Sequence, residues 1–234
     1  MISMTGLRKL RIAALNRLFK WTVGRLPAYQ VWSDEINVIS DCDQAIKSML
    51  FDHLKKLKEA GVEKPTLLDV GGREGERKVF AKGYEYVGMD IEPKSESFIQ
   101  ADICNCPHIA DESFDVIMSF DVFEHLERPW DAAKECVRIL KPNGLMVHRT
   151  LFAYRYHPCP IDYWRFSSQG LEYLFQRTGK MQTLLSGYDL RIRRHDKRSL
   201  MAHGKDSPPL DYLGGFRENW RVLYIGRKCA STTD

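Results

Sequence analysis

Thr66-Leu67-Leu68-Asp69-Val70-Gly71-Gly72-Arg73-Glu74-Gly75 is the stretch that decides the fold, and Tyr86-Val87-Gly88-Met89-Asp90 completes it. An apolar strand runs directly into a glycine-containing turn, and a second strand ends in an acid. Glycines let the backbone approach a ligand closely, and an acid about 20 residues further on can accept hydrogen bonds from both hydroxyls of a ribose. The two strand ends therefore predict a nucleotide-binding turn.

Strand and helix patterns alternate along the rest of the chain. Strands are expected at 66–70, 84–89, 98–102, 114–120 and 145–151, and helices at 41–60, 77–81 and 130–140, with Lys141 to Gly144 ending the last helix. A helix capped by Ser167 or Ser168 and closed by Gly179 then precedes two further strands, at 181–185, extending to 190 at most, and at 221–225. This alternation predicts an α/β, Rossmann-like, doubly wound sheet that is mostly parallel, with the ligand at the carboxyl ends of its strands.

Composition limits the function classes. The chain has 234 residues, of which 44% are hydrophobic, so we expect a single domain at 33–234 behind a basic extension at 1–32. A net charge of +4 is too mild to indicate a nucleic-acid partner. The six cysteines form no CxxC pair, which predicts no metal site, no disulfide framework and a cytoplasmic location. No apolar run approaches the roughly 20 residues that span a bilayer, so we expect no membrane crossing.

Two basic segments stand apart from this average. The chain before Asp34 carries six lysines and arginines and no acid, with apolar residues at helical spacing across 7–26. This segment is expected to be an amphipathic helix on anionic lipid, a mitochondrial-type targeting segment, or a helix packed over the ligand site. The second, 191–205, is expected to be a solvated loop or a contact for an anionic substrate.

The glycine turn departs from the dinucleotide fingerprint, because a frame that starts at Gly71 places Arg73 and Glu76 where the second and third glycines should stand. It resembles instead the first motif of class I S-adenosylmethionine-dependent methyltransferases, in which an acid precedes Gly-x-Gly-x-Gly. Asp69, Gly71 and Gly75 match, and Arg73 replaces the middle glycine. The resemblance runs from about Leu67 to Leu174, and the 114–144 segment is similar to the ubiquinone/menaquinone-type group, methyltransferase type 11.

This resemblance implies S-adenosylmethionine as cofactor and a seven-stranded sheet whose last strand is antiparallel. Asp90 would then hold the ribose hydroxyls, Asp102 the adenine amino group, and Ile103 would make a backbone contact to the ring. The full set of cofactor residues expected is Asp69, Gly71, Gly72, Arg73, Gly75, Asp90, Ile91, Asp102, Ile103 and Phe120. Arg73 either crowds the turn or adds a cation near the ligand's carboxylate, and Asp102 alternatively caps a turn.

The segment His157-Pro158-Cys159-Pro160-Ile161-Asp162-Tyr163-Trp164-Arg165-Phe166-Ser167 is the second informative feature. It is similar to a His-Pro-x-Pro-x-Asp-Tyr-Trp-Arg-Phe-Thr stretch in a subgroup of these enzymes, many associated with bacterial polysaccharide or glycan gene sets. A proline-stiffened loop that carries polar groups and aromatics fits an acceptor pocket, with Tyr163, Trp164 and Arg165 binding substrate. The alternative is a structural lid in which Trp164 and Phe166 pack in the core and Arg165 pairs with Asp162.

An alcohol acceptor must lose its proton during methyl transfer, so a base is expected nearby. His157, with Asp162 as its partner, is the first candidate, and His125 after the 114–120 strand is the rival. Ser119-Phe120-Asp121-Val122 has no proline, which argues against methylation of nucleic-acid adenine. The prediction is an O-methyltransferase acting on a sugar hydroxyl of a glycan or glycolipid. A natural-product or quinone-like acceptor and a non-catalytic binding module of the same fold are the alternatives.

Overall fold

The computed structural model describes residues 37, 39, 41–154, 156–193 and 217–230. The basic segment 7–26 and most of the second basic segment therefore lie outside the described residues. Seven strands form one sheet in the order β3-β2-β1-β4-β5-β7-β6. The strands are β1 (Thr66–Val70), β2 (Glu85–Asp90), β3 (Ile99–Gln100), β4 (Phe114–Phe120), β5 (Leu140–Ala153), β6 (Met181–Arg193) and β7 (Arg217–Lys228).

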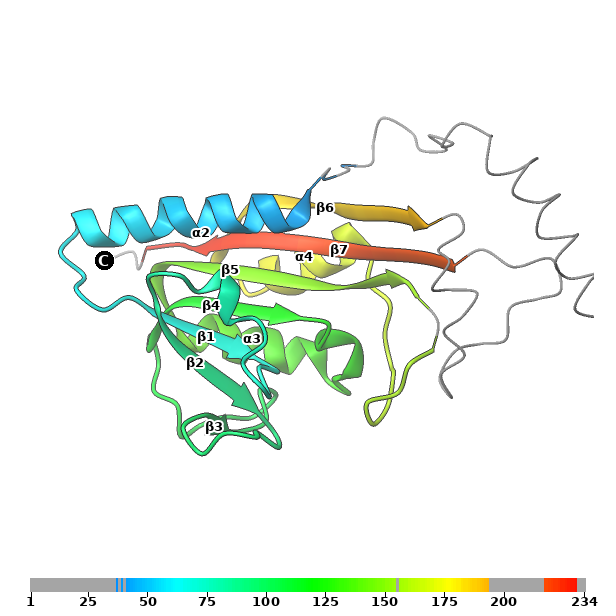
Figure 1. Cartoon of the computed structure of the whole chain (residues 1–234), viewed down its shortest axis with the longest axis horizontal. Helices are drawn as coiled ribbons and strands as arrows, with labels where there is room; N and C mark the ends of the chain where they lie inside the picture. The colour runs from blue at the N-terminus through cyan, green and yellow to red at the C-terminus, as the bar shows by residue number, and fades with distance from the viewer. Residues whose placement is uncertain (1–36, 38, 40, 155, 194–216, 231–234) are drawn as a thin grey trace, which may run out of the picture.

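The strand directions confirm the predicted fold. Strands β1 to β5 pair in parallel, and β7 is antiparallel to both β5 and β6. The helices are α2 (Cys42–Glu59), α3 (Pro129–Ile139) and α4 (Ser168–Gln176), with short 3₁₀ turns η1 (Lys78–Phe80) and η2 (Phe123–His125). Helix α2 lies along one face of the sheet, and α3 and α4 lie on the other (Figure 1). No helix of the described ranges is long and apolar enough to cross a membrane.

Alternating side chains of the central strands fill a core on each face. Leu68 of β1 packs with Ile117 and Met146 on the α3/α4 face, whereas Leu67 packs with neighbouring strand residues under α2. Caps fix where the helices begin: Asp41 accepts a hydrogen bond from Gln44 N at 3.0 Å before α2. The Ser167 hydroxyl accepts one from Gly170 N at 3.0 Å before α4, which agrees with the sequence expectation.

Strands β6 and β7 are longer than the strands expected at 181–190 and 221–225, and three other elements differ more clearly from the predicted ones. The helix expected at 77–81 is the single 3₁₀ turn η1, and the strand expected at 98–102 is limited to two residues. The segment 141–144 does not separate α3 from β5 but belongs to β5, which begins at Leu140. The register shifts here between the Phe114 and Val116 pairs, and Asn143 has a φ of 62°. The turn-forming residues therefore make a bulge inside the strand.

Asp115 anchors this bulge to the start of β1. Its Oδ2 accepts hydrogen bonds from Thr66 N at 2.8 Å and Thr66 Oγ1 at 2.9 Å, and it lies 2.9 Å from Lys141 Nζ. Burial opposes ionisation, but these contacts outweigh it and lower the pKa of Asp115. Asp115 is thus a structural residue at the amino edge of the sheet, as its place at a strand start indicates.

Candidate cofactor and acceptor site

The glycine turn lies at the carboxyl end of β1 and is fastened to the end of β2. Gly71 N donates a hydrogen bond to Met89 O at 2.7 Å. Gly71 has a φ of 76°, and a Cβ there would overlap the Val122 side chain; a Cβ on Gly72 would lie 2.7 Å from Asp69 Oδ2. The turn therefore has room only for glycine at these two positions.

Asp69 lies beneath the turn and is fully buried. Tyr86 Oη donates to Asp69 Oδ2 at 2.6 Å, and Arg77 Nη1 lies 3.5 Å from Asp69 Oδ1 and 3.2 Å from Gly71 O. Arg77 also donates to the backbone carbonyl of the buried Phe120. Burial raises the pKa of Asp69 to about 6, against the opposing effects of Arg77 and Tyr86. Asp69 thus shapes the turn from below.

Neither Arg77 nor Tyr86 is among the residues expected from the sequence. In the sequence, Arg77 lies in a stretch with an ordinary helical pattern. Tyr86 lies on a strand, at a position that is expected to be half-buried. Their roles depend on contacts with Asp69, which lies 8 and 17 residues away in sequence. No local pattern signals such contacts.

Arg73, which replaces the middle glycine of the motif, points away from the turn. Its Nη2 lies 3.4 Å from Glu92 Oε2, and the side chain is about half exposed. Lys94 N donates to Arg73 O at 3.1 Å, and Lys94 also pairs with Glu74. The arginine therefore lies against the segment that follows β2 and does not crowd the glycines.

The expected nucleoside contacts lie at the same edge. Asp90 ends β2, and its Oδ1 accepts a hydrogen bond from Glu92 N at 2.9 Å. Ile91 beside it is 58% exposed, whereas Ile103 is buried. Asp102 is exposed and accepts from Cys104 N at 2.8 Å, so it also caps a turn. An acid at a strand end, an open glycine turn and an apolar neighbour fit a nucleoside cofactor.

Hydrogen bonds to backbone carbonyls hold the 157–167 loop against η2 and the residue that follows it. Tyr163 N and Trp164 N donate to Glu124 O at 2.8 and 3.1 Å, and Trp164 Nε1 donates to Leu126 O at 2.8 Å. The side chains of Tyr163 and Trp164 nevertheless stay 42% and 37% exposed. Phe166 packs against the core and Arg165 pairs with Asp162, as the lid alternative expects, whereas the exposed Tyr163 and Trp164 fit a pocket.

Asp162 organises the polar part of this loop. Its Oδ2 accepts from His157 N at 2.8 Å, lies 3.2 Å from His157 Nδ1, and accepts from Arg165 Nη2 at 2.7 Å. Burial opposes ionisation, but the hydrogen bonds from Arg165 and His157 outweigh it and hold the pKa of Asp162 well below its usual range. Burial lowers the pKa of His157, and Asp162 acts in the opposite direction. The predicted His157 and Asp162 pair is therefore in contact.

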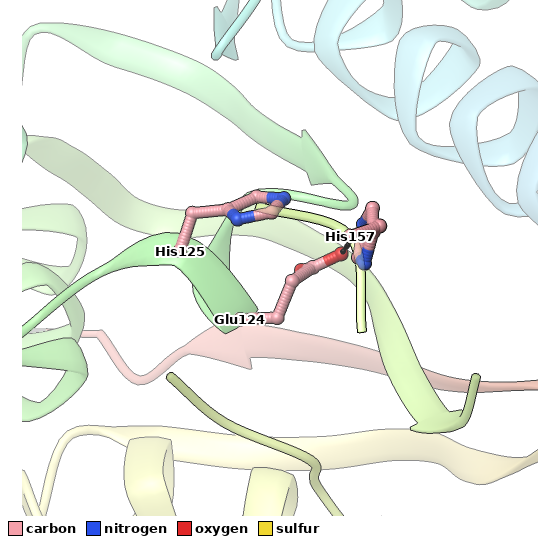
Figure 2. Close-up of side chains that lie close together, drawn as sticks. All are labelled: Glu124, His125 and His157. Atoms are coloured by element: carbon pink, nitrogen blue, oxygen red, sulfur yellow. Dashed lines mark ion pairs between the residues drawn. The ribbon is translucent and has the colours of Figure 1, made fainter. Parts of the chain in front are cut away.

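His125 and Glu124 complete the cluster. His157 Nε2 lies 3.8 Å from Glu124 Oε1, and the ring centroids of His125 and His157 are 4.8 Å apart. Figure 2 shows how the three side chains lie. Glu124 has no exposed side-chain surface; its Oε2 accepts from Thr150 Oγ1 at 2.7 Å, and burial raises its pKa. Glu124 stands directly before the predicted His125, yet its type and position alone do not mark it as a site residue.

Two further features are distinct from the expected site residues. His148 is buried in β5 and stacks on Phe175 with ring centroids 4.5 Å apart, and burial lowers its pKa to about 3, so it is a neutral core residue. A cavity of about 710 Å³, lined by residues that include His53, Lys56 and Arg227, opens at the amino ends of the strands. Ligands of such sheets bind at the carboxyl ends, so this cavity does not belong to the site.

Comparison with known proteins agrees with this geometry. Residues 68–148 match the model of the methyltransferase domain family. An uncharacterized methyltransferase of Mycobacterium ulcerans is 35% identical over 96 residues, which is 35% of this chain and 37% of that protein. The match thus spans little more than a third of such relatives.

Solved structures share the fold at low identity. The YcgJ protein of Bacillus subtilis superposes with a TM-score of 0.52 at 16% identity, covering 77% of this chain and 100% of that one. An S-adenosylmethionine-dependent methyltransferase of Archaeoglobus fulgidus gives 0.51 at 14% identity, covering 80% and 100%. At this identity the likeness establishes the architecture alone.

Proposed function

We propose that this chain, which carries a class I methyltransferase domain with S-adenosylmethionine as its cofactor, transfers a methyl group to a hydroxyl of a sugar in a glycan or glycolipid. The observation that carries the proposal is the 157–167 loop. It brings a histidine, its carboxylate partner and two exposed aromatic side chains to the sheet edge where the glycine turn opens. Aromatic faces suit sugar rings, and the polar pair suits a hydroxyl.

The residues of the glycine turn and of the β2 end would hold the cofactor. Gly71, Gly72 and Gly75 leave the backbone free of side chains, and Asp90 would accept hydrogen bonds from ribose hydroxyls. Asp102, Ile91 and Ile103 would surround the adenine. Asp69 lies beneath the turn, where Arg77 links it to the carbonyls of Gly71 and Phe120, and Arg73 lies outside the turn. When bound, S-adenosylmethionine supplies an electrophilic methyl group on a sulfonium.

The acceptor hydroxyl would give its proton to His157. Asp162 Oδ2 faces Nδ1 of the ring, which favours a proton on Nδ1 and leaves Nε2 as the basic atom. Tyr163 and Trp164 would pack against the acceptor, and Arg165 holds Asp162 in place through a two-point ion pair. His125 lies beside His157 and remains the rival base. Alignment of the hydroxyl with the methyl group and exclusion of water would supply the rest of the rate acceleration.

The test combines cofactor binding with an acceptor panel. Calorimetry with S-adenosylmethionine should show one site, and mass spectrometry should detect an acceptor that gains one methyl group. The panel contains sugar nucleotides, glycolipids and quinone-like phenols. Because a positioned base contributes about 10²- to 10⁴-fold, His157→Ala should lower kcat by that factor and leave cofactor affinity unchanged.

Each outcome has a separate meaning. Absence of cofactor binding by folded protein overturns the methyltransferase proposal, and methylation of phenols alone overturns the sugar acceptor. If His157→Ala and Asp162→Asn both leave turnover intact, the base and its partner are assigned incorrectly. Tyr156→Phe is the matched control, because Tyr156 is an exposed residue next to His157 whose hydroxyl has no assigned role.

A further inference from the structure

We infer that Glu124, His125 and His157 form a binding site for a divalent transition-metal ion, with Glu124 Oε1 and the Nε2 atoms of the two histidines as ligands. One ligand atom from each residue lies within 4.8 Å of the others. The side chains converge from η2 and from the loop after β5 (Figure 2). Two imidazoles and one carboxylate are a ligand set used by iron, manganese, cobalt and zinc sites.

The hydrogen bonds around the histidines prepare them as ligands. His125 Nδ1 lies 2.8 Å from the carbonyl oxygen of Ile161, and His157 Nδ1 lies 3.2 Å from Asp162 Oδ2. Both partners are acceptors, so each Nδ1 carries the proton and each Nε2 keeps its lone pair. Metal-binding histidines characteristically donate their second nitrogen to a carboxylate or a backbone carbonyl, which fixes both tautomer and ring orientation.

The carboxylate provides an independent observation. Glu124 is fully buried, and Oε2 is satisfied by Thr150, but Oε1 has no hydrogen-bond partner within the described part of the chain. A buried polar atom without a partner costs free energy, and such atoms are uncommon in native proteins. Oε1 faces His157 Nε2 at 3.8 Å, so a cation between them would satisfy it.

The spacing is close to that of a filled site. Metal bonds to histidine nitrogen and carboxylate oxygen are about 2 Å long, which places neighbouring ligand atoms roughly 3 to 3.5 Å apart. The Glu124 and His157 atoms are near that separation already, and small rotations of the side chains close the rest. Three protein ligands leave coordination positions open toward the acceptor side.

This inference goes beyond the proposed function and does not depend on the acceptor. A metal ion and a proton cannot share His157 Nε2, so the base role of His157 applies to the protein without the ion. With the ion present, His157 is a ligand, and an acceptor oxygen bound to the ion becomes more acidic. The sequence predicted no metal because its three ligands come from segments more than 30 residues apart and no cysteine takes part.

The experiment measures metal binding without cofactor or acceptor. Full-length protein is treated with a chelator, dialysed, and titrated with Co²⁺ followed by visible absorption, and with Zn²⁺ by calorimetry. We expect one ion per chain. Glu124→Gln keeps the size of the side chain and an oxygen for Thr150, and it should weaken binding by at least about tenfold, as should His157→Gln.

The controls are Glu127→Gln and His108→Gln, which change an exposed glutamate near η2 and an exposed histidine outside the cluster. Both should bind one ion with wild-type affinity. Asp162→Asn should weaken binding by about 10- to 100-fold, because a neutral amide is a weaker acceptor for His157 Nδ1 than the carboxylate. The inference is overturned if the folded protein binds no stoichiometric metal ion, or if Glu124→Gln and His157→Gln both leave metal binding unchanged. Binding of S-adenosylmethionine tests the proposed function separately.

Discussion

Gly71→Ala tests whether the glycine turn is confined by its neighbours or only by its backbone conformation. Gly71 has a φ of 76°, and a Cβ there would overlap the Val122 side chain. Gly61 after α2 has a φ of 83°, but nothing lies within 4 Å of a Cβ added to it. Gly61→Ala therefore introduces the backbone strain alone, and Gly71→Ala introduces the same strain together with the overlap.

The expected magnitudes follow from these two contributions. A non-glycine residue in the left-handed region costs about 1 to 2 kcal/mol, and an extra methyl group forced into packed surroundings costs about 1 to 3 kcal/mol. Gly61→Ala should therefore lower the free energy of unfolding by about 1 to 2 kcal/mol. Gly71→Ala should lower it by about 2 to 5 kcal/mol, the sum of the two contributions.

Urea unfolding followed by circular dichroism measures both losses, and calorimetry measures the affinity for S-adenosylmethionine. Gly71→Ala should lower the affinity for S-adenosylmethionine by about tenfold or more. A shift of the turn that costs about 1.4 kcal/mol of binding free energy has that effect. Gly61→Ala should leave affinity unchanged. Equal losses of stability in the two variants would refute the steric argument.

A double variant identifies the side chain responsible. Val122→Ala removes the methyl groups that the new Cβ would meet. Gly71→Ala combined with Val122→Ala should therefore be more stable than the sum of the single losses predicts, by about 1 kcal/mol or more. Additive losses would mean that the turn relaxes in another direction.

The remaining predictions concern charge and the amino-terminal segment. The pKa of Asp69 is raised from 3.8 to about 6, so the folded state binds its proton more tightly. Relative to Asp69→Asn, the wild-type free energy of unfolding should fall by about 2.4 kcal/mol as the pH rises from 4 to 7, and a flat difference across urea titrations would contradict this. Arg221→Met breaks a half-buried ion pair with Asp121, whose Oδ2 lies 2.9 Å from Arg221 Nη2. Urea unfolding should show that the free energy of unfolding falls by about 1.5 to 3 kcal/mol. The control Lys55→Met, which breaks an exposed ion pair, should lower it by less than about 1 kcal/mol. Full-length protein should co-sediment with anionic liposomes more than a chain that begins at Ser33, and equal binding would remove the amphipathic-helix interpretation.

The sheet could be predicted because its signals are local. Each central strand is a short apolar run between turn residues, and alternation with helices fixes parallel pairing and the ligand edge. The β5 bulge could not be predicted, since Lys141 to Gly144 has the composition of both a helix stop and a bulge. The choice between them depends on pairing with Phe114 and Val116, which lie more than 20 residues away in sequence.

The polar cluster illustrates a second limit. The proline-stiffened segment was predicted to place His157 and Asp162 together, and it does because they are separated by only five residues. Only the structure shows that Glu124 belongs to this cluster, because it lies on η2, 33 residues before His157. A buried carboxylate also contradicts the general expectation that glutamate is exposed. A residue whose importance comes from burial cannot be recognised from its type.

Arg73 connects the motif to the question of cofactor binding. The alternative of a non-catalytic binding module requires Arg73 to block the turn at the position where the methyltransferase motif has glycine. Gly71 and Gly72 lack space for a side chain, because Val122 and Asp69 lie against them. Position 73 differs: its side chain extends outward to Glu92 and is about half exposed. The substitution therefore falls at a position of the turn that tolerates a side chain.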